Sequence, residues 1–127
     1  VYKRQKLIGA DCILLIASIL SDQQIEEFVK ITKKLELDYL IEIHDEKELK
    51  RVERYKDALI GVNNRDLNTF KVDLDNSIRM KNLFKEKNIF IAESGIKSID
   101  DINYLKLHNI NVFLIGESLM RGGFFKK

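Results

Sequence analysis

The chain has 127 residues, of which 45% are hydrophobic and 33% charged, as in an ordinary globular domain. Its formal net charge of +2 is too small to favour nucleic-acid or membrane binding, and no apolar run is long enough to span a bilayer. Without proline or a low-complexity linker, residues 1–127 are expected to form one domain. The single cysteine, Cys12, lies in an apolar run, so we expect a buried structural thiol. The start does not resemble a signal peptide, so we expect a cytoplasmic protein.

Five short apolar runs predict strands, and helical patterns separate them. The helix at residues 1–7 is expected to stop at Gly9. Strands are predicted at residues 12–17, 39–43, 58–62, 89–92 and 112–115. Because the runs at residues 89–92 and 112–115 are rich in Ile, Val and Phe, we expect these two strands to be buried on both faces. The strand at residues 12–17 is also expected to be buried.

Polar residues mark where the intervening helices begin. Ser21 and Gln24 fit a capping box, Asp45 and Ser98 are plausible N-caps, and a further helix is expected over residues 75–87, burying Ile78, Leu83 and Phe84. This strict alternation predicts an α/β fold of parallel βα repeats. Right-handed crossovers place every carboxyl strand end on one edge of the sheet, where ligands bind.

Polar side chains stand at these strand ends. Glu42 and Glu93 close two apolar runs, and Asn63 follows a third. A carboxylate inside such a run is costly unless it is paired or functional, and burial would raise its pKa so that it could act as a general acid or base. The alternative is a carboxylate that caps the next helix or pairs with a lysine.

Two glycine turns follow the last two strands, Glu93-Ser94-Gly95 and Gly116-Glu117-Ser118. They can direct several backbone N–H groups to one point, which is the chemistry of a phosphate cradle. The simpler alternative is that the glycines only permit tight turns.

The remaining polar cluster is Asn63-Asn64-Arg65-Asp66, within a long polar loop at residues 63–73. Arg65 could bind an anionic group bidentately or pair with an aspartate to stiffen the loop. His44 and His108 have no second His or Cys at ligand spacing, so no metal is expected. No GxGxxG or P-loop pattern is present, so no nucleotide cofactor is expected.

Five segments carry a family resemblance. They are GADCILLIASIL, LIEIHDEKEL, IGVNNRDLNTFKVDL, IAESGIKSIDDI and FLIGESLMR. In this order they resemble indole-3-glycerol phosphate synthase, the lyase of tryptophan biosynthesis, from about Ile8 to Arg121. The resemblance implies part of a (β/α)8 TIM barrel, strands four to eight with four to five helices. It also implies ring closure, with loss of carbon dioxide and water, of a phosphorylated substrate, and no cofactor.

The resemblance also assigns roles. It implies that Glu42 is the general base, that Asn63 holds the substrate and that Glu93 contacts it. Arg65 would lie in the same substrate loop. Ser94, Gly95, Gly116 and Glu117 would form the phosphate loops, with Glu117 acting through its backbone N–H. Leu14 and Leu114 would form apolar walls of the aromatic pocket.

The family's general-acid lysine, on the third strand of the barrel, has no counterpart in these residues, nor has an essential Glu–Lys pair on the first. We therefore expect no turnover by this chain alone. Five strands would also leave two sheet edges open, which predicts self-association through them.

Two other classes of protein share some of these features. Five parallel strands suit an open flavodoxin-like binding module, but a receiver would need acidic residues where Ala17-Ser18 stands. Another phosphate-binding barrel enzyme would share the glycine turns but not the EIHDE and NNRDL segments.

Overall fold

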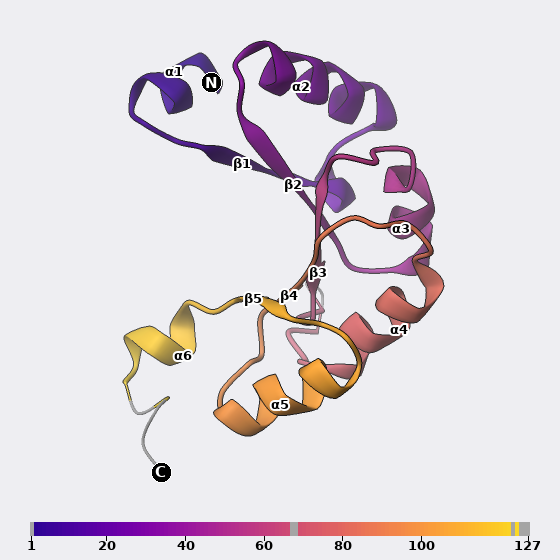
Figure 1. The fold of residues 1–127 in the computed structure, drawn as a ribbon, viewed down its shortest axis with the longest axis vertical. Helices are drawn as coiled ribbons and strands as arrows, with labels where there is room; N and C mark the ends of the chain where they lie inside the picture. Colours follow the sequence, from indigo (N-terminus) through magenta and orange to yellow (C-terminus); the bar gives the residue numbers. More distant parts are fainter. Residues whose placement is uncertain (1, 67–68, 123, 125–127) are drawn as a thin grey trace.

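The computed structural model describes residues 2–66, 69–122 and 124. The strands form one parallel sheet in the order β1-β2-β3-β4-β5, with helices between them (Figure 1). The strands are β1 Cys12–Ile16, β2 Asp38–Ile43, β3 Leu59–Asn63, β4 Phe90–Glu93 and β5 Val112–Leu114. The helices are α1 Tyr2–Leu7, α2 Asp22–Lys34, α3 Glu46–Val52, α4 Asp75–Leu83, α5 Ile99–Leu107 and α6 Glu117–Met120, with a 3-10 turn at Ala17–Ile19.

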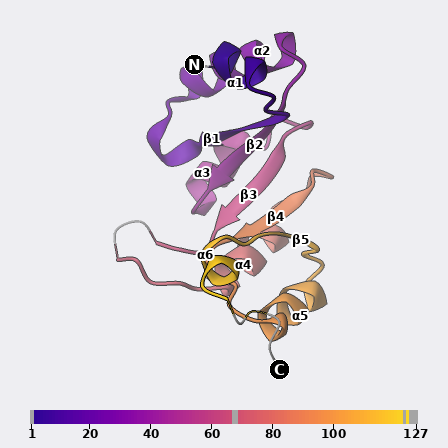
Figure 2. The same ribbon diagram turned by 90° about the vertical axis from the view of Figure 1, so that its left-hand side faces the viewer.

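The sheet curves into an arc, and helices α2 to α5 lie along its outer side (Figures 1 and 2). Each strand pairs with the next strand in the chain, as in a barrel built from βα units. A flavodoxin-like module has helices on both faces and a reordered sheet. The sequential strand order therefore excludes that alternative and confirms a partial α/β barrel.

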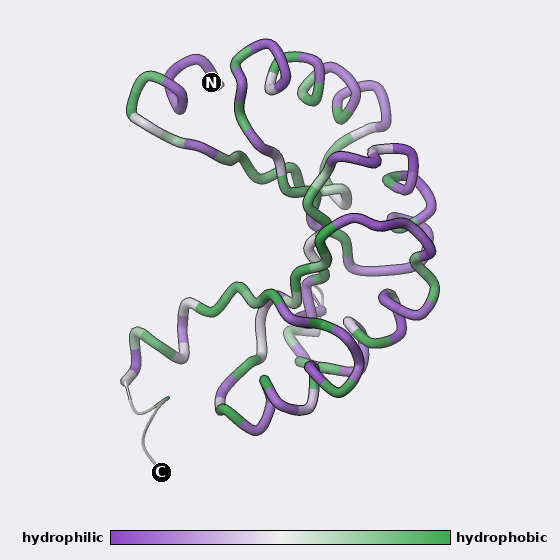
Figure 3. Tube along the Cα trace, viewed as in Figure 1, coloured by the Kyte–Doolittle hydropathy of each residue, from purple (hydrophilic) through white to green (hydrophobic). Residues whose placement is uncertain are grey.

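The hydrophobic core lies between the outer face of the sheet and these helices. Alternate strand residues such as Leu15, Ile41 and Val62 point into it and are fully buried, and Ile25 and Leu105 meet them from α2 and α5. Figure 3 shows the strands as mostly hydrophobic and the helices as mixed. The period-two pattern of each strand thus buries its outward residues.

The inner face of the sheet is covered unevenly. Leu40 and Ile91 in the middle strands are buried, whereas Leu14, Val112 and Leu114 in the outer strands are 46%, 41% and 56% exposed. The expectation of a strand buried on both faces was therefore wrong for β5, and the expectation of a buried strand was wrong for the inner face of β1. Cys12 shares the inner face of β1 and is exposed, so the expectation of a buried thiol was also wrong.

The helix starts follow the predicted caps. Ser21 and Gln24 form a complete capping box, Ser98 forms another with Asp101, and the Asp45 side chain accepts from the Glu48 N–H. Gly9 adopts a φ of 89° just after α1, as expected for a helix stop.

Every predicted strand differs from the observed one by a single residue at one or both ends, and the largest difference is at the end of helix α4. Helix α4 ends at Leu83 rather than at Lys87, because Phe84 turns to an extended conformation and packs its ring 6.0 Å from that of Phe90. Leu83 is consequently exposed, not buried. Ile89 was predicted as the first residue of a strand, but β4 begins at Phe90. Ile89 is exposed, and its carbonyl accepts a hydrogen bond from the Ile60 N–H.

The two faces of β1 provide a matched test of this packing. Leu15 is 1% exposed, so the Leu15→Ala variant should lose buried apolar surface and leave a cavity. We expect its free energy of unfolding to fall by about 2–5 kcal/mol. The neighbouring Leu14→Ala variant should lose much less, because Leu14 faces the open side. Urea denaturation of both variants measures the difference. Equal losses would contradict the assignment of the two faces.

Candidate active site

The carboxyl ends of β2 to β5 open into one cavity with a volume of about 1250 Å³. Parallel register brings them there: Glu42 lies beside Gly61, Asn63 beside Glu93, and Glu93 beside Leu114. The cavity is lined by all of the predicted site residues except Leu14: Glu42, Asn63, Arg65, Glu93, Ser94, Gly95, Leu114, Gly116 and Glu117. Leu14 is on the inner face of β1, outside this lining.

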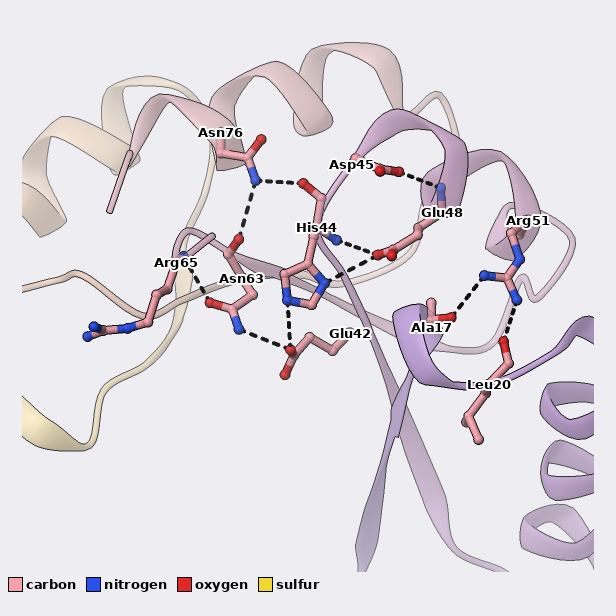
Figure 4. Close-up of polar contacts among 10 residues, drawn as sticks. All are labelled: Ala17, Leu20, Glu42, His44, Asp45, Glu48, Arg51, Asn63, Arg65 and Asn76. Carbon is pink, nitrogen blue, oxygen red and sulfur yellow. Dashed lines mark hydrogen bonds and ion pairs between the residues drawn. The ribbon is translucent and has the colours of Figure 1, made fainter. Parts of the chain in front are cut away.

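Asn63 holds Glu42 in place. Its side-chain Nδ2 donates to Oε1 of Glu42 at 3.0 Å, and its Oδ1 accepts from the backbone N–H of Arg65 at 3.0 Å (Figure 4). The second bond fixes the amide orientation, so the NH2 group faces the carboxylate.

Glu93 is the more deeply buried carboxyl group, only 3% exposed. Burial, followed by the charge of Glu42 and a hydrogen bond with it, raises the pKa of Glu93 to about 8. With the pKa of Glu93 raised in this way, we expect the pair to hold one proton at neutral pH, because two neighbouring buried carboxyl groups do not readily ionise together. Such a pair offers a base and an acid in one cavity.

Gly61 is a site residue that the sequence reasoning missed. A Cβ built on this glycine would overlap the carboxylate of Glu93, so only glycine leaves room for that side chain. The signal was a glycine in the interior of an apolar strand, which often marks close approach by another group.

Asn64 is the second missed residue, and its role is structural. It is 2% exposed, its Nδ2 donates to the Ser94 carbonyl, and its Oδ1 accepts from the N–H and hydroxyl of Ser77. Asn64 thereby joins the ends of β3 and β4 to the start of α4. Its place in the Asn63–Asp66 polar cluster was visible, but not its burial.

The two glycine turns lie on the same cavity. Ser94 and Gly95 have φ values of 65° and 78°, and the side chain of Val72 packs where a Gly95 Cβ would lie. Gly116 leads into α6. Within the described residues, the backbone N–H groups of Gly95, Gly116 and Glu117 donate to no protein acceptor. Unused donors that line one cavity are suited to an anion.

Arg65 also lines this cavity. Its guanidinium lies 3.3 Å from Glu117, which also pairs with Arg121 at 2.8 Å. The Arg65 backbone forms an isolated antiparallel bridge with Val72, which orders the described part of the 63–73 loop. Arg65 thus pairs with Glu117 rather than with an aspartate of its own loop, and its side chain is 36% exposed.

Three further predicted features can be placed. His44 lies beside Glu42, whereas His108 caps the end of α5. Within residues 2–66, 69–122 and 124 no three metal-ligating side chains are grouped, and no helix is long and apolar enough to cross a membrane. The absence of a metal or cofactor stays a prediction.

The raised pKa of Glu93 predicts a pH-dependent stability. Between pH 4.5, the ordinary pKa, and about 8, the folded protein keeps a proton that the unfolded chain releases. The free energy of unfolding should therefore fall as pH rises through this window, by at most about 1.4 kcal/mol per unit. Glu93→Gln should remove this slope, whereas Glu46→Gln on exposed α3 should retain it. Urea denaturation at several pH values measures both, and an unchanged slope in Glu93→Gln would refute the assignment.

Comparisons with known proteins identify the family of this chain. The family model described as indole-3-glycerol phosphate synthase matches residues 2–126. A protein of that name from Acinetobacter baumannii is 48% identical over 117 residues, covering 91% of this chain and 44% of the relative. One from Legionella pneumophila is 46% identical over 115 residues, covering 91% and 45%. The chain thus spans less than half the length of these curated relatives. Because the family model matches nearly all of its residues, the chain belongs to the indole-3-glycerol phosphate synthase family.

Proposed function

We propose that this chain forms strands four to eight of an indole-3-glycerol phosphate synthase and that its cavity binds the phosphorylated substrate and product of that reaction. The reaction closes 1-(2-carboxyphenylamino)-1-deoxyribulose 5-phosphate to indole-3-glycerol phosphate, with loss of carbon dioxide and water. The observation that carries the proposal is that the buried Glu42–Glu93 pair and the two glycine turns line the same cavity.

The carboxyl pair supplies the proton chemistry. In this proposal Glu42, which accepts a hydrogen bond from Asn63, is ionised and acts as the general base. Glu93 keeps the shared proton and can donate it to a substrate oxygen, while Asn63 holds the substrate through its amide. Loss of water requires both proton removal and protonation of the departing hydroxyl, and two carboxyl groups in different protonation states meet that need.

The remaining groups would position the substrate. The N–H groups of Gly95, Gly116 and Glu117, with Ser94, would hold the phosphate at the ends of β4 and β5. Leu114 and Leu14, both on the exposed inner face, would contact the aromatic ring. The partly exposed side chain of Arg65 would bind an anionic group of the substrate through its guanidinium.

The relatives are named as this synthase, which favours it over another phosphate-binding barrel enzyme. A small phosphorylated molecule is therefore the expected partner, and the cytoplasmic location stays a prediction. Self-association through the outer strands β1 and β5 is also a proposal, supported by their position at the two ends of the strand order. Light scattering at high protein concentration would contradict it if only monomers were found.

Binding of the product tests the proposed cavity. Calorimetry should detect indole-3-glycerol phosphate binding to the wild-type chain, with inorganic phosphate as the control for the cradle alone. Gly116→Leu should weaken binding by at least about tenfold, because the larger side chain would occupy phosphate space. A Cβ at Gly116 has no atom of the described residues within 4 Å, so Gly116→Ala should fold normally and bind with an intermediate affinity. Absence of wild-type binding would refute the proposal.

We also expect no turnover by the purified chain, because the family's general-acid lysine corresponds to no residue of this sequence. The measurement is indole-3-glycerol phosphate formation from the synthase substrate, followed by fluorescence. Detectable binding with no turnover is the expected combination. Robust synthesis by the chain alone would contradict the assignment of an essential acid to that lysine.

A further inference from the structure

His44 lies at the end of β2 with its imidazole ring held between two carboxylates (Figure 4). Its Nε2 lies 3.3 Å from Oε1 of Glu42, and its Nδ1 lies 3.3 Å from Oε2 of Glu48. The ring side chain is 15% exposed, so water screens these contacts little. The established features of the site give His44 no role, although it touches the carboxylate proposed as the base.

The backbone around His44 fixes the ring in this position. The His44 N–H donates to Oε2 of Glu48 at 2.7 Å, and Asn76 Nδ2 donates to the His44 carbonyl at 3.0 Å. Glu48 is held in turn because its own N–H donates to the capping Asp45. His44 is therefore a fixed bridge between the start of α3 and Glu42.

The ring nitrogens limit where protons can lie. A carboxylate accepts only, so Nδ1 beside Glu48 carries a hydrogen. Nε2 is buried, and within the described residues it has no hydrogen-bond partner of good geometry, with Glu42 as its neighbouring carboxylate. A neutral ring would direct the Nε2 lone pair at an ionised Glu42, which is repulsive. A proton must therefore lie between them, on Nε2 or on Glu42.

The surroundings favour the proton on Nε2. Glu42 already accepts a hydrogen bond from Asn63 on the same Oε1, which stabilises its ionised form. Glu93 is more deeply buried than Glu42 and is the better place for a neutral acid. A ring between the two carboxylates Glu42 and Glu48 is also best stabilised as a cation.

Other charged groups face His44 across a second cavity of about 610 Å³. Those that line it with His44 and Glu48 are Asp45, Arg65, Asp66, Lys71, Asp73 and Arg79. Arg79 pairs with Asp73 at 3.0 Å and Arg65 with Glu117 at 3.3 Å, so these cations have carboxylate partners of their own. The charged groups within ion-pair distance of the ring are both carboxylates.

We propose that His44 is a positioning residue for the carboxyl pair: its imidazolium, fixed between Glu48 and Glu42, keeps Glu42 ionised and leaves the shared proton on Glu93. The inference rests on the proposed function in one respect, namely that an ionised Glu42 serves as the base. The assignment of the proton to His44 and Glu93 rather than to Glu42 can be tested without any ligand.

The first test uses the wild-type, ligand-free chain. Nitrogen-15 NMR of the imidazole rings at about pH 6.5 should show both nitrogens of His44 protonated. A His44 ring with hydrogen on Nδ1 and a bare Nε2 would overturn the proposal, because the proton would then belong to Glu42. This measurement needs no variant and so does not depend on how well a substituted chain folds.

The second test moves the proton. With carbon-13 label in the glutamate carboxyl groups, His44→Gln should shift the Glu42 signal toward the protonated position and the Glu93 signal toward the ionised one. His108→Gln, at the far end of α5, should leave both signals unchanged. Signals that stay at their wild-type positions in a folded His44→Gln chain would overturn the proposal, since a merely structural histidine would not redistribute charge.

Failure of the proposed function would look different. A chain that does not bind indole-3-glycerol phosphate in calorimetry, but whose Glu42 and Glu93 signals exchange on His44→Gln, would retain the His44 inference and lose the ligand. A chain that binds the ligand but has a bare Nε2 would retain the function and lose the inference.

Discussion

Two carboxyl groups buried side by side at neighbouring strand ends set the requirements for the rest of this site. Ionising Glu42 and Glu93 at the same time would be costly, because both are buried and their charges repel. The pKa of Glu93 is therefore raised to about 8, and we expect the pair to hold one proton at neutral pH. The structure accommodates this arrangement at three points. Gly61 leaves space for Glu93, Asn63 donates to Glu42, and His44 contacts Glu42 from the side of α3.

The parallel register explains why these groups meet at all. Each βα unit returns the chain to the same edge, so residues far apart in sequence reach one cavity without long connections. The helices cover the outer face, and the inner residues Leu14 and Leu114 are exposed. Stability and chemistry are thus separated: outward residues form the core, and inward residues at the strand ends line the cavity.

The strand pattern and helix caps predicted the sheet and the helix starts, because these depend on local periodicity and hydrogen bonding. All predicted site residues except Leu14 line the cavity, although they make up only part of its lining. Exposure was less predictable. Cys12 and Leu114 are as apolar as core residues, and their exposure depends on what packs against the inner face, which the pattern does not contain. Gly61, Asn64 and the contacts of His44 were missed for a related reason: each acts on a neighbour brought in by another strand or helix.

A crystal structure of this chain with indole-3-glycerol phosphate tests the central claim most directly. We predict the phosphate within hydrogen-bond distance of the Gly95, Gly116 and Glu117 N–H groups, with the indole ring next to Leu114 and within reach of Glu42 and Glu93. A ligand bound elsewhere, or a phosphate held only by surface lysines, would contradict the claim that the strand ends of this sheet form the substrate site.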